Sequence, residues 1–152
     1  MKKIILVSFA VLIYYISTGQ LVARMQVKDS DTLTGICDRN NIYSLLIFKG
    51  QEAAVCAVSD KEIETRLNNE VTYLQQHPDH KDNGIVSIII NCKGEVIRCQ
   101  TDNKTKSEEL DKQILAVYAT LRDWKPAKIN GKKVDSVSLF GFDIKDGKIK
   151  VH

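Results

Sequence analysis

Four cysteines are the residues whose chemistry is most easily named: Cys37, Cys56, Cys92 and Cys99. In an oxidising compartment four thiols allow three complete disulfide pairings. Cys92 lies in a predicted hairpin turn and Cys99 about five residues along the outgoing strand, which separates them by on the order of 15 Å, beyond disulfide reach. The sequence therefore favours Cys37 with Cys56 as a local bridge, with buried free thiols as the alternative. The absence of Cys-x-x-Cys argues against a zinc site.

The histidines offer little catalytic chemistry. His77 and His80 lie in a polar loop with Asp79 and Asp82, which could hold a metal ion, although a solvated loop explains the same residues. The chain has no Gly-x-Ser-x-Gly, no phosphate-binding loop and no His-Glu-x-x-His. We therefore expect no enzyme activity, no bound metal and no cofactor.

The charge of the chain is close to balanced. The formal net charge is +3, and without Lys2 and Lys3 the rest of the chain carries 20 basic and 19 acidic residues. This balance argues against nucleic acid as the main partner.

The first 19 residues have the layout of a secretory signal peptide. Lys2 and Lys3 precede an apolar run of 13 residues, Ile4 to Ile16, and small polar residues follow. A membrane-spanning helix needs about 20 apolar residues, so an uncleaved anchor is the weaker interpretation. We expect cleavage near Gly19-Gln20 and export to the periplasm, with only indirect contact with the membrane.

Residues 20–58 are predicted to be an extended leader that contains a hairpin. The stretch 42–48 is typical of a strand, Gly50-Gln51 of a turn, and 53–57 of a return strand. A short helix is the alternative for this segment.

A compact domain is predicted over residues 59–152. Ser59 and Glu62 form a capping box at the start of a helix that continues until Pro78. Its apolar residues recur at helical spacing: Ile63, Leu67, Val71 and Leu74.

A hairpin, a second helix and a last strand complete the predicted domain. The strands 85–90 and 95–101 flank a turn at Gly94, where a positive φ is expected. The second helix is expected to be capped by Thr105 or Ser107 and to end at Pro126. Its apolar stripe is Leu110, Ile114, Val117, Tyr118, Leu121 and Trp124. Asn130-Gly131 predicts a tight turn before a strand from Val134 to Ile144.

Residues 59–148 resemble the C-terminal domain of the TonB family in element order and in several motifs. The most specific are Trp124-Lys125-Pro126-Ala127 and the following Asn130-Gly131, which are similar to the family's helix exit and last-strand entry. Leu110-Asp111 and the hairpin glycine Gly94 also fit. The resemblance implies an α+β fold in the order helix, strand, strand, helix, strand, with a small antiparallel sheet. TonB itself has a long Pro-rich spacer, whereas this chain has only Pro78 and Pro126.

The resemblance implies a binding role for the last strand, which in the family lies at a sheet edge and pairs with a transporter peptide. The strand contains no proline, so every N–H is available for an added strand. Gly141 suggests a bulge or a close backbone approach. The expected peptide-binding residues are Val134, Ser136, Val137, Ser138, Leu139, Phe140, Gly141 and Phe142. A strand with a covered edge is the alternative.

Two functional hypotheses follow. The first is a periplasmic module that binds an envelope protein or a TonB-dependent transporter peptide by strand addition in TonB-linked transport; a homodimer is compatible with it. The second is a structural or sensory envelope domain that uses the same fold without transporter contact. Because at least one of Ser136 and Ser138 is expected to face solvent, proline at Ser138 is predicted to abolish binding without unfolding the domain.

Overall fold

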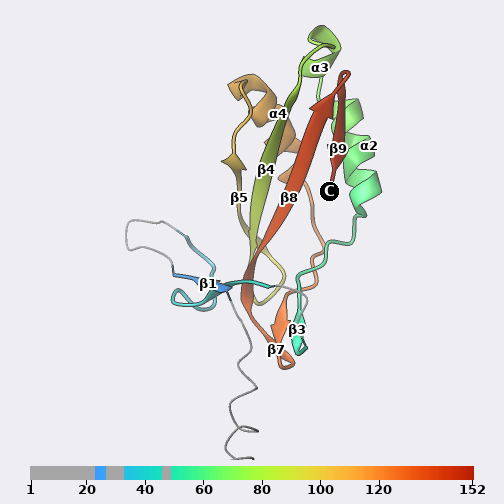
Figure 1. Cartoon of the computed structure of the whole chain (residues 1–152). Helices are drawn as coiled ribbons and strands as arrows, with labels where there is room; N and C mark the ends of the chain where they lie inside the picture. Colours follow the sequence, from blue (N-terminus) through green and yellow to red (C-terminus); the bar gives the residue numbers. More distant parts are fainter. Residues whose placement is uncertain (1–22, 27–32, 46–48) are drawn as a thin grey trace, which may run out of the picture.

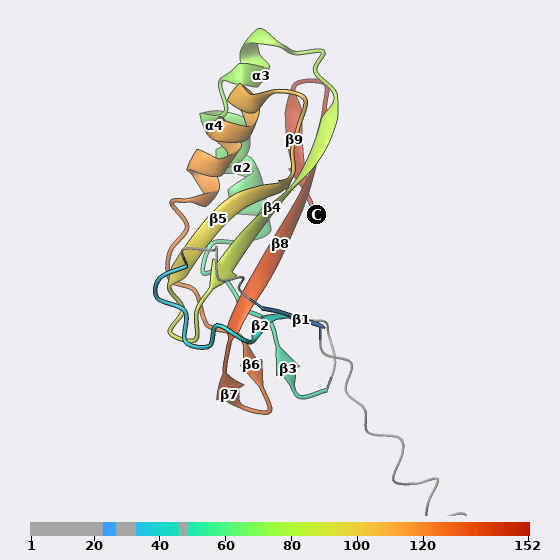
Figure 2. The same ribbon diagram turned by 90° about the vertical axis from the view of Figure 1, so that its left-hand side faces the viewer.

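The computed structural model describes residues 23–26, 33–45 and 49–152, so the predicted signal peptide lies outside the described residues. The described part is α+β, as predicted. Three helices cover one face of a sheet (Figures 1 and 2): α2 (Asp60–Glu70), α3 (Tyr73–Gln76) and α4 (Glu108–Tyr118). None of the described helices has the length and apolar character that a membrane crossing requires.

The main sheet has six strands in the order β1-β2-β8-β4-β5, with β9 also paired to β8. Their bounds are β1 Ala23–Met25, β2 Ile42–Ser44, β4 Asp82–Ile90, β5 Val96–Asn103, β8 Asp135–Lys145 and β9 Lys148–Val151. A second, three-stranded sheet consists of β3 Gln51–Glu52, β6 Lys128–Ile129 and β7 Lys132–Lys133. The predicted order appears as α2, β4, β5, α4 and β8.

Local signals in the sequence set the starts of the helices. The hydroxyl of Ser59 accepts a hydrogen bond from the N–H of Glu62 at 3.3 Å, which satisfies one of the free donors of the first turn of α2. Ser107, not Thr105, does the same for Leu110 at the start of α4.

The ends of both helices differ from the prediction. The helix before Pro78 is interrupted at Val71, whose extended backbone ends α2, and α3 follows as a separate turn. Helix α4 ends at Tyr118, not at Trp124. Leu121 and Trp124 are nevertheless buried, because the loop after α4 folds back on the core and Asp123 takes a φ of 61°. The helical spacing of Leu121 and Trp124 in the sequence therefore predicted their burial correctly and their helical conformation incorrectly.

The predicted N-terminal hairpin is wrong, because the predicted return arm 53–57 forms no strand and has only the isolated bridge of Val55 to Lys125, while the short strand β3 falls on part of the predicted turn. Strand β2 pairs with β1 and β8, whereas β3 pairs with β6. The edge of β8 offers β2 a buried position, where Ile42 is fully buried beside Leu33 and Ile89. Residues 46–48 lie outside the described part.

The main core lies between the helices and the sheet. The predicted helix stripes are buried there: Ile63, Leu67, Val71, Leu74, Leu110, Ile114, Val117, Tyr118, Leu121 and Trp124. They pack against alternate residues of β4 and β8, including Val86, Ile88 and Phe142. This burial is the main source of stability of the domain.

The disulfide joins Cys37 to Cys92, so the predicted Cys37–Cys56 bridge is wrong. The segment before β2 runs along the β4–β5 turn, which brings Cys37 to Cys92, whereas Cys56 lies near the carbonyl of Arg122. Cys56 and Cys99 are free.

The carboxylate of Asp135 lies next to the disulfide and binds the same two segments, the leader and the β4–β5 turn. It is buried and accepts hydrogen bonds from the backbone N–H groups of Cys37, Asp38 and Cys92 at 2.7–2.8 Å. A carboxylate that receives three amides is stabilised without a cationic partner. The leader, the hairpin and the start of β8 are thus held together at one point.

Candidate functional site

The two edges of β8 differ in how far they are covered. Strand β4 pairs with one edge from Ser136 to Ile144. On the other edge, β2 pairs with the first three residues of β8, and β9 pairs with Phe142 to Lys145. The N–H of His152 extends the β9 contact by donating to the carbonyl of Gly141 at 3.0 Å.

Between these two strands, Ser138, Leu139 and Phe140 have no partner on that edge among the residues that the structure describes. We call them the β8 window. The carbonyl of Gly141 points toward β9, and hydrogen-bonding directions alternate along a strand. The N–H and C=O of Leu139 therefore face the window, and those of Ser138 and Phe140 face β4. At about 3.3 Å per residue, the window is roughly 10 Å long.

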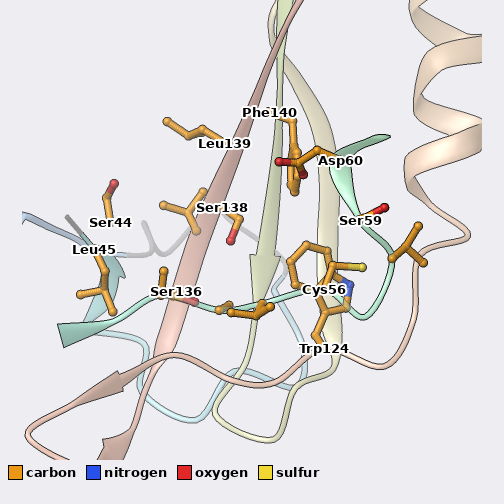
Figure 3. A pocket seen from close by; sticks show the side chains of 15 residues that line it. Ser44, Leu45, Cys56, Ser59, Asp60, Trp124, Ser136, Ser138, Leu139 and Phe140 are labelled. Atoms are coloured by element: carbon orange, nitrogen blue, oxygen red, sulfur yellow. The ribbon is translucent and has the colours of Figure 1, made fainter. Parts of the chain in front are cut away.

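A groove of about 630 Å³ lies at this window. Figure 3 shows its side chains, which come from the end of β2, the segment 53–60, Trp124 and residues 136–140. Three large hydrophobic side chains are exposed in the described part of the chain, and two of them line this groove: Val55 at 56% and Leu139 at 55%. Clustered exposed apolar side chains are typical of an interaction site.

Two buried polar atoms of the groove lining have no hydrogen-bond partner among the described residues. They are the indole Nε1 of Trp124 and the hydroxyl of Ser136, in side chains of residues only 6% and 2% exposed. Figure 3 shows the indole with its nitrogen on the side of Cys56. A buried donor without an acceptor costs about 1–3 kcal/mol. A ligand that brings an acceptor to this part of the groove would recover that free energy.

Backbone contacts hold the segment 53–60 against the loop after α4. The N–H of Val55 donates to the carbonyl of Lys125 at 3.0 Å, and the N–H of Lys125 donates back at 2.8 Å. The cap at Ser59 fixes the other end of the segment. The groove therefore has a defined wall on this side.

The motif residues behind the TonB resemblance support this wall. A Cβ at Gly94, whose φ is +88°, would lie 2.3 Å from the carbonyl oxygen of Trp124 and 3.5 Å from Pro126. Only glycine fits there without a shift of the backbone. Trp124 packs edge-to-face on Phe140 at 6.1 Å. Farther away, Leu110 is buried in α4, and Asn130-Gly131 makes the predicted turn between β6 and β7 with positive φ at both residues.

The predicted peptide-binding residues fall into different environments. Val134 precedes β8, and Val137 is paired with Ser44 of β2. Ser136 is buried and Ser138 is half-buried, so of the two serines only Ser138 is partly exposed to solvent. Phe142 is 1% exposed in the core.

At Gly141 a Cβ would lie 2.7 Å from the imidazole Nε2 of His152, which is an exposed side chain and not backbone, so this contact is not the predicted close backbone approach. Because β2 and β9 take the ends of β8, the predicted eight-residue edge is reduced to the β8 window.

The other candidate groups serve the structure. Sulfur and carboxylate atoms of Cys37, Cys92 and Asp135 lie within 4.8 Å of one another, but the sulfurs are bonded together and the carboxylate holds three amides. His77 stacks on Tyr73 at 4.1 Å. Burial raises the pKa of the Cys99 thiol to about 11, which keeps it protonated at neutral pH.

Sequence reasoning missed the segment 53–60 as part of the site. The sequence signal for this part of the site was weak: Val55 is apolar, but the residues around it show no clear periodicity that would predict whether it is buried or exposed. Comparison of the chain with protein-family models, with curated proteins and with solved structures finds no match.

Proposed function

We propose that this protein is a protein-binding module of the bacterial cell envelope that holds an extended segment of a partner in the β8 window. The observation that carries the proposal is the window itself. There, the backbone N–H and C=O of Leu139 have no strand partner among the described residues, and they lie in a groove with exposed apolar side chains and two buried polar atoms that also have no described partner.

An extended peptide matches each of these features. Its main chain would donate to and accept from Leu139, as in other cases of strand addition. Separate apolar side chains of the peptide would cover Leu139 and Val55, both more than half exposed. A side-chain or main-chain oxygen would accept from the indole of Trp124. The short window limits strand pairing to about three residues, so the side-chain contacts must supply much of the affinity.

The sequence supports an envelope location and a class of partner. The first 19 residues have the layout of a signal peptide, and the Cys37–Cys92 disulfide is compatible with an oxidising compartment. The resemblance to the TonB C-terminal domain favours an envelope protein or a transporter peptide as the partner, in TonB-linked transport. Contact with the membrane would be indirect.

Site-specific photo-crosslinking in living cells tests the proposal. A photoreactive amino acid in place of Leu139 or Val55 should form an adduct with one envelope protein. The same amino acid in place of Asp143, which is exposed on β8 beyond the window, is the matched control. Mass spectrometry should map both adducts to one extended segment of the partner, and a synthetic peptide of that segment should bind the purified protein.

Two outcomes would contradict the proposal. One is equal crosslinking from positions 139 and 143. The other is a mapped peptide that binds the parent and a Leu139→Pro variant equally well. In either case the structural or sensory role becomes the better explanation.

A further inference from the structure

The opposite edge of the main sheet is also unpaired. The sheet ends at β5, whose one described strand partner is β4. Figure 1 shows β5 at the margin of the sheet beside β4. This edge takes no part in the proposed function.

The regular part of β5 is short and its backbone direction is defined. Arg98 pairs with Ile89 of β4, and Gln100 pairs with Ser87. The register of the pairing shifts at both ends of this stretch: between Ile89 and Ile90 at one end, and between Ile85 and Val86 at the other. Ile88 lies opposite Ser138, whose backbone groups face β4, so the N–H and C=O groups of Ile88 point toward β8 and those of Ser87 and Ile89 point toward β5. The N–H and C=O groups of the intervening Cys99 and of Thr101 therefore point outward from the sheet.

The side chains along this edge carry opposite charges at a fixed spacing. Arg98, Gln100 and Asp102 lie on the sheet face away from the helices, where Asp102 Oδ1 accepts from Ser87 Oγ at 2.8 Å and from Gln100 Nε2 at 2.9 Å. Arg98 is half-buried and has no hydrogen-bond or ion-pair partner among the described residues. An unpaired guanidinium next to a sheet edge is a group that a partner strand could neutralise.

We propose that two copies of this protein join through β5 in an antiparallel pair, with Gln100 at the two-fold axis. In this register Arg98 of each copy lies directly opposite Asp102 of the second copy. Cys99 of each copy exchanges backbone hydrogen bonds with Thr101 of the second copy. Opposite charges that face each other across two strands stabilise the pairing, and a two-fold axis supplies the pair twice.

The charges select this register over its neighbours. Outward-facing residues must pair with outward-facing residues, so the two-fold axis can pass through Cys99, Gln100 or Thr101. Only the axis at Gln100 places Arg98 directly opposite Asp102. The same charges discourage pairing with unrelated strands. Because each copy uses its β5 edge once, the dimer is closed and leaves both β8 windows accessible.

A charge-swap series tests the dimer on protein produced from the full chain. The parent should show a concentration-dependent dimer in sedimentation equilibrium. Arg98→Asp places two acid pairs at the interface and should weaken association about tenfold or more, as should Asp102→Arg. The double variant restores opposite charges and should return association to within about threefold of the parent. Circular dichroism checks that each variant is folded.

A cysteine at the axis tests the register independently. In Gln100→Cys the two new thiols would face each other across a non-hydrogen-bonded pair, with Cα atoms about 4.5 Å apart, which a disulfide can bridge. This variant should form a covalent dimer on mild oxidation, whereas Lys145→Cys, exposed on β8, should crosslink no faster than the parent. The proposal is overturned if the parent stays monomeric at millimolar concentration. It is also overturned if the double variant stays as weak as the single ones, or if positions 100 and 145 crosslink equally.

Discussion

The β8 window and the β5 edge are stretches of the same sheet that have no strand partner in the described part of the chain, but they differ in chemistry. The window lies in a groove between β2 and β9, and its exposed side chains are apolar, with Leu139 and Val55 more than half exposed. The β5 edge carries Arg98, Gln100 and Asp102 in one row. An apolar groove gains free energy from a ligand that removes it from water, whereas a charged row gains it from a partner with the complementary order of charges.

The difference shows that an unpaired edge is not by itself a binding site. The window depends on side chains from other parts of the chain, especially Trp124 and Val55, and on two neighbouring strands that limit its length. The charged row of the β5 edge comes from β5 itself, with the hydroxyl of Ser87 on β4 donating to Asp102. Substitution of Trp124 should therefore change stability and binding together, whereas substitution of Arg98 should change association alone.

Trp124→Ala should have the largest effect, because the indole packs in the core and against Phe140. We expect a loss of about 3–5 kcal/mol in the free energy of unfolding, measured by urea denaturation. Trp124→Phe is the sharper variant, because it keeps most of the packing and removes only the unpartnered donor. It should weaken peptide binding while it costs much less stability than Trp124→Ala. Equal binding by Trp124→Phe and the parent would show that the indole nitrogen does not contact the ligand.

Loss of the disulfide should have the next largest effect. The bridge closes a loop with a sequence separation of 55 residues, for which the chain-entropy estimate is about 4 kcal/mol. The double variant Cys37→Ser and Cys92→Ser should show this loss in denaturant unfolding. Because the bridge holds the segment that leads into β2, hydrogen exchange at Val137 should increase more than exchange at Arg98 and Gln100, whose N–H groups face β4. Equal increases at both edges would contradict a local role for the bridge.

Two proline variants distinguish the covered edge of β8 from the open one. The N–H of Ser138 faces β4, so Ser138→Pro breaks the central ladder and should cost roughly 3 kcal/mol. The sequence predicted that this variant stays folded and loses only binding; from the structure we expect a loss of stability instead. Leu139→Pro removes the N–H that faces the window and should cost roughly 1 kcal/mol while it abolishes peptide binding. Thermal unfolding and titration with the crosslinked peptide separate the two effects. Similar stability of both variants would mean that the backbone directions are assigned wrongly.

The smallest effects are expected from a single alanine on each of the two edges. Leu139→Ala and Arg98→Ala should each change the free energy of unfolding by less than about 0.5 kcal/mol, because neither side chain contributes to the core. Leu139→Ala should still weaken peptide binding, and Arg98→Ala should still weaken dimer formation. A loss of more than about 1 kcal/mol in either variant would assign that side chain a structural role.

Features determined by a few neighbouring residues were predictable from the sequence. The caps at Ser59 and Ser107 and the Asn130-Gly131 turn follow from hydrogen bonds and φ angles within four residues. The apolar stripes predicted which helix residues are buried. The apolar stripe of α4 predicted the end of that helix too late in the sequence. Leu121 and Trp124 continue the helical spacing, but they lie in the loop after α4, which buries them without helical structure.

Features that depend on distant parts of the chain were not predictable. The partner of Cys37 is set by the path of the leader along the β4–β5 turn and by Asp135, nearly a hundred residues away. The β8 window exists because β2 and β9 are short, and strand length at a sheet edge has no local signature. The edge strand was thus predicted correctly as a strand and incorrectly as a fully open one.

The Cys37–Cys92 bridge has a consequence for the order in which the chain can be oxidised. A chain that emerges from its N-terminus presents Cys56 to Cys37 well before Cys92 is available, and the carboxylate that organises the native pair, Asp135, arrives last. A premature Cys37–Cys56 bond would have to be exchanged by attack of a thiolate, which is a slow step without an isomerase. Cys56→Ser should therefore reach the native disulfide faster in oxidative refolding, as followed by trapping of free thiols at successive times. An unchanged rate would mean that the fold brings Cys37 and Cys92 together before any thiol reacts.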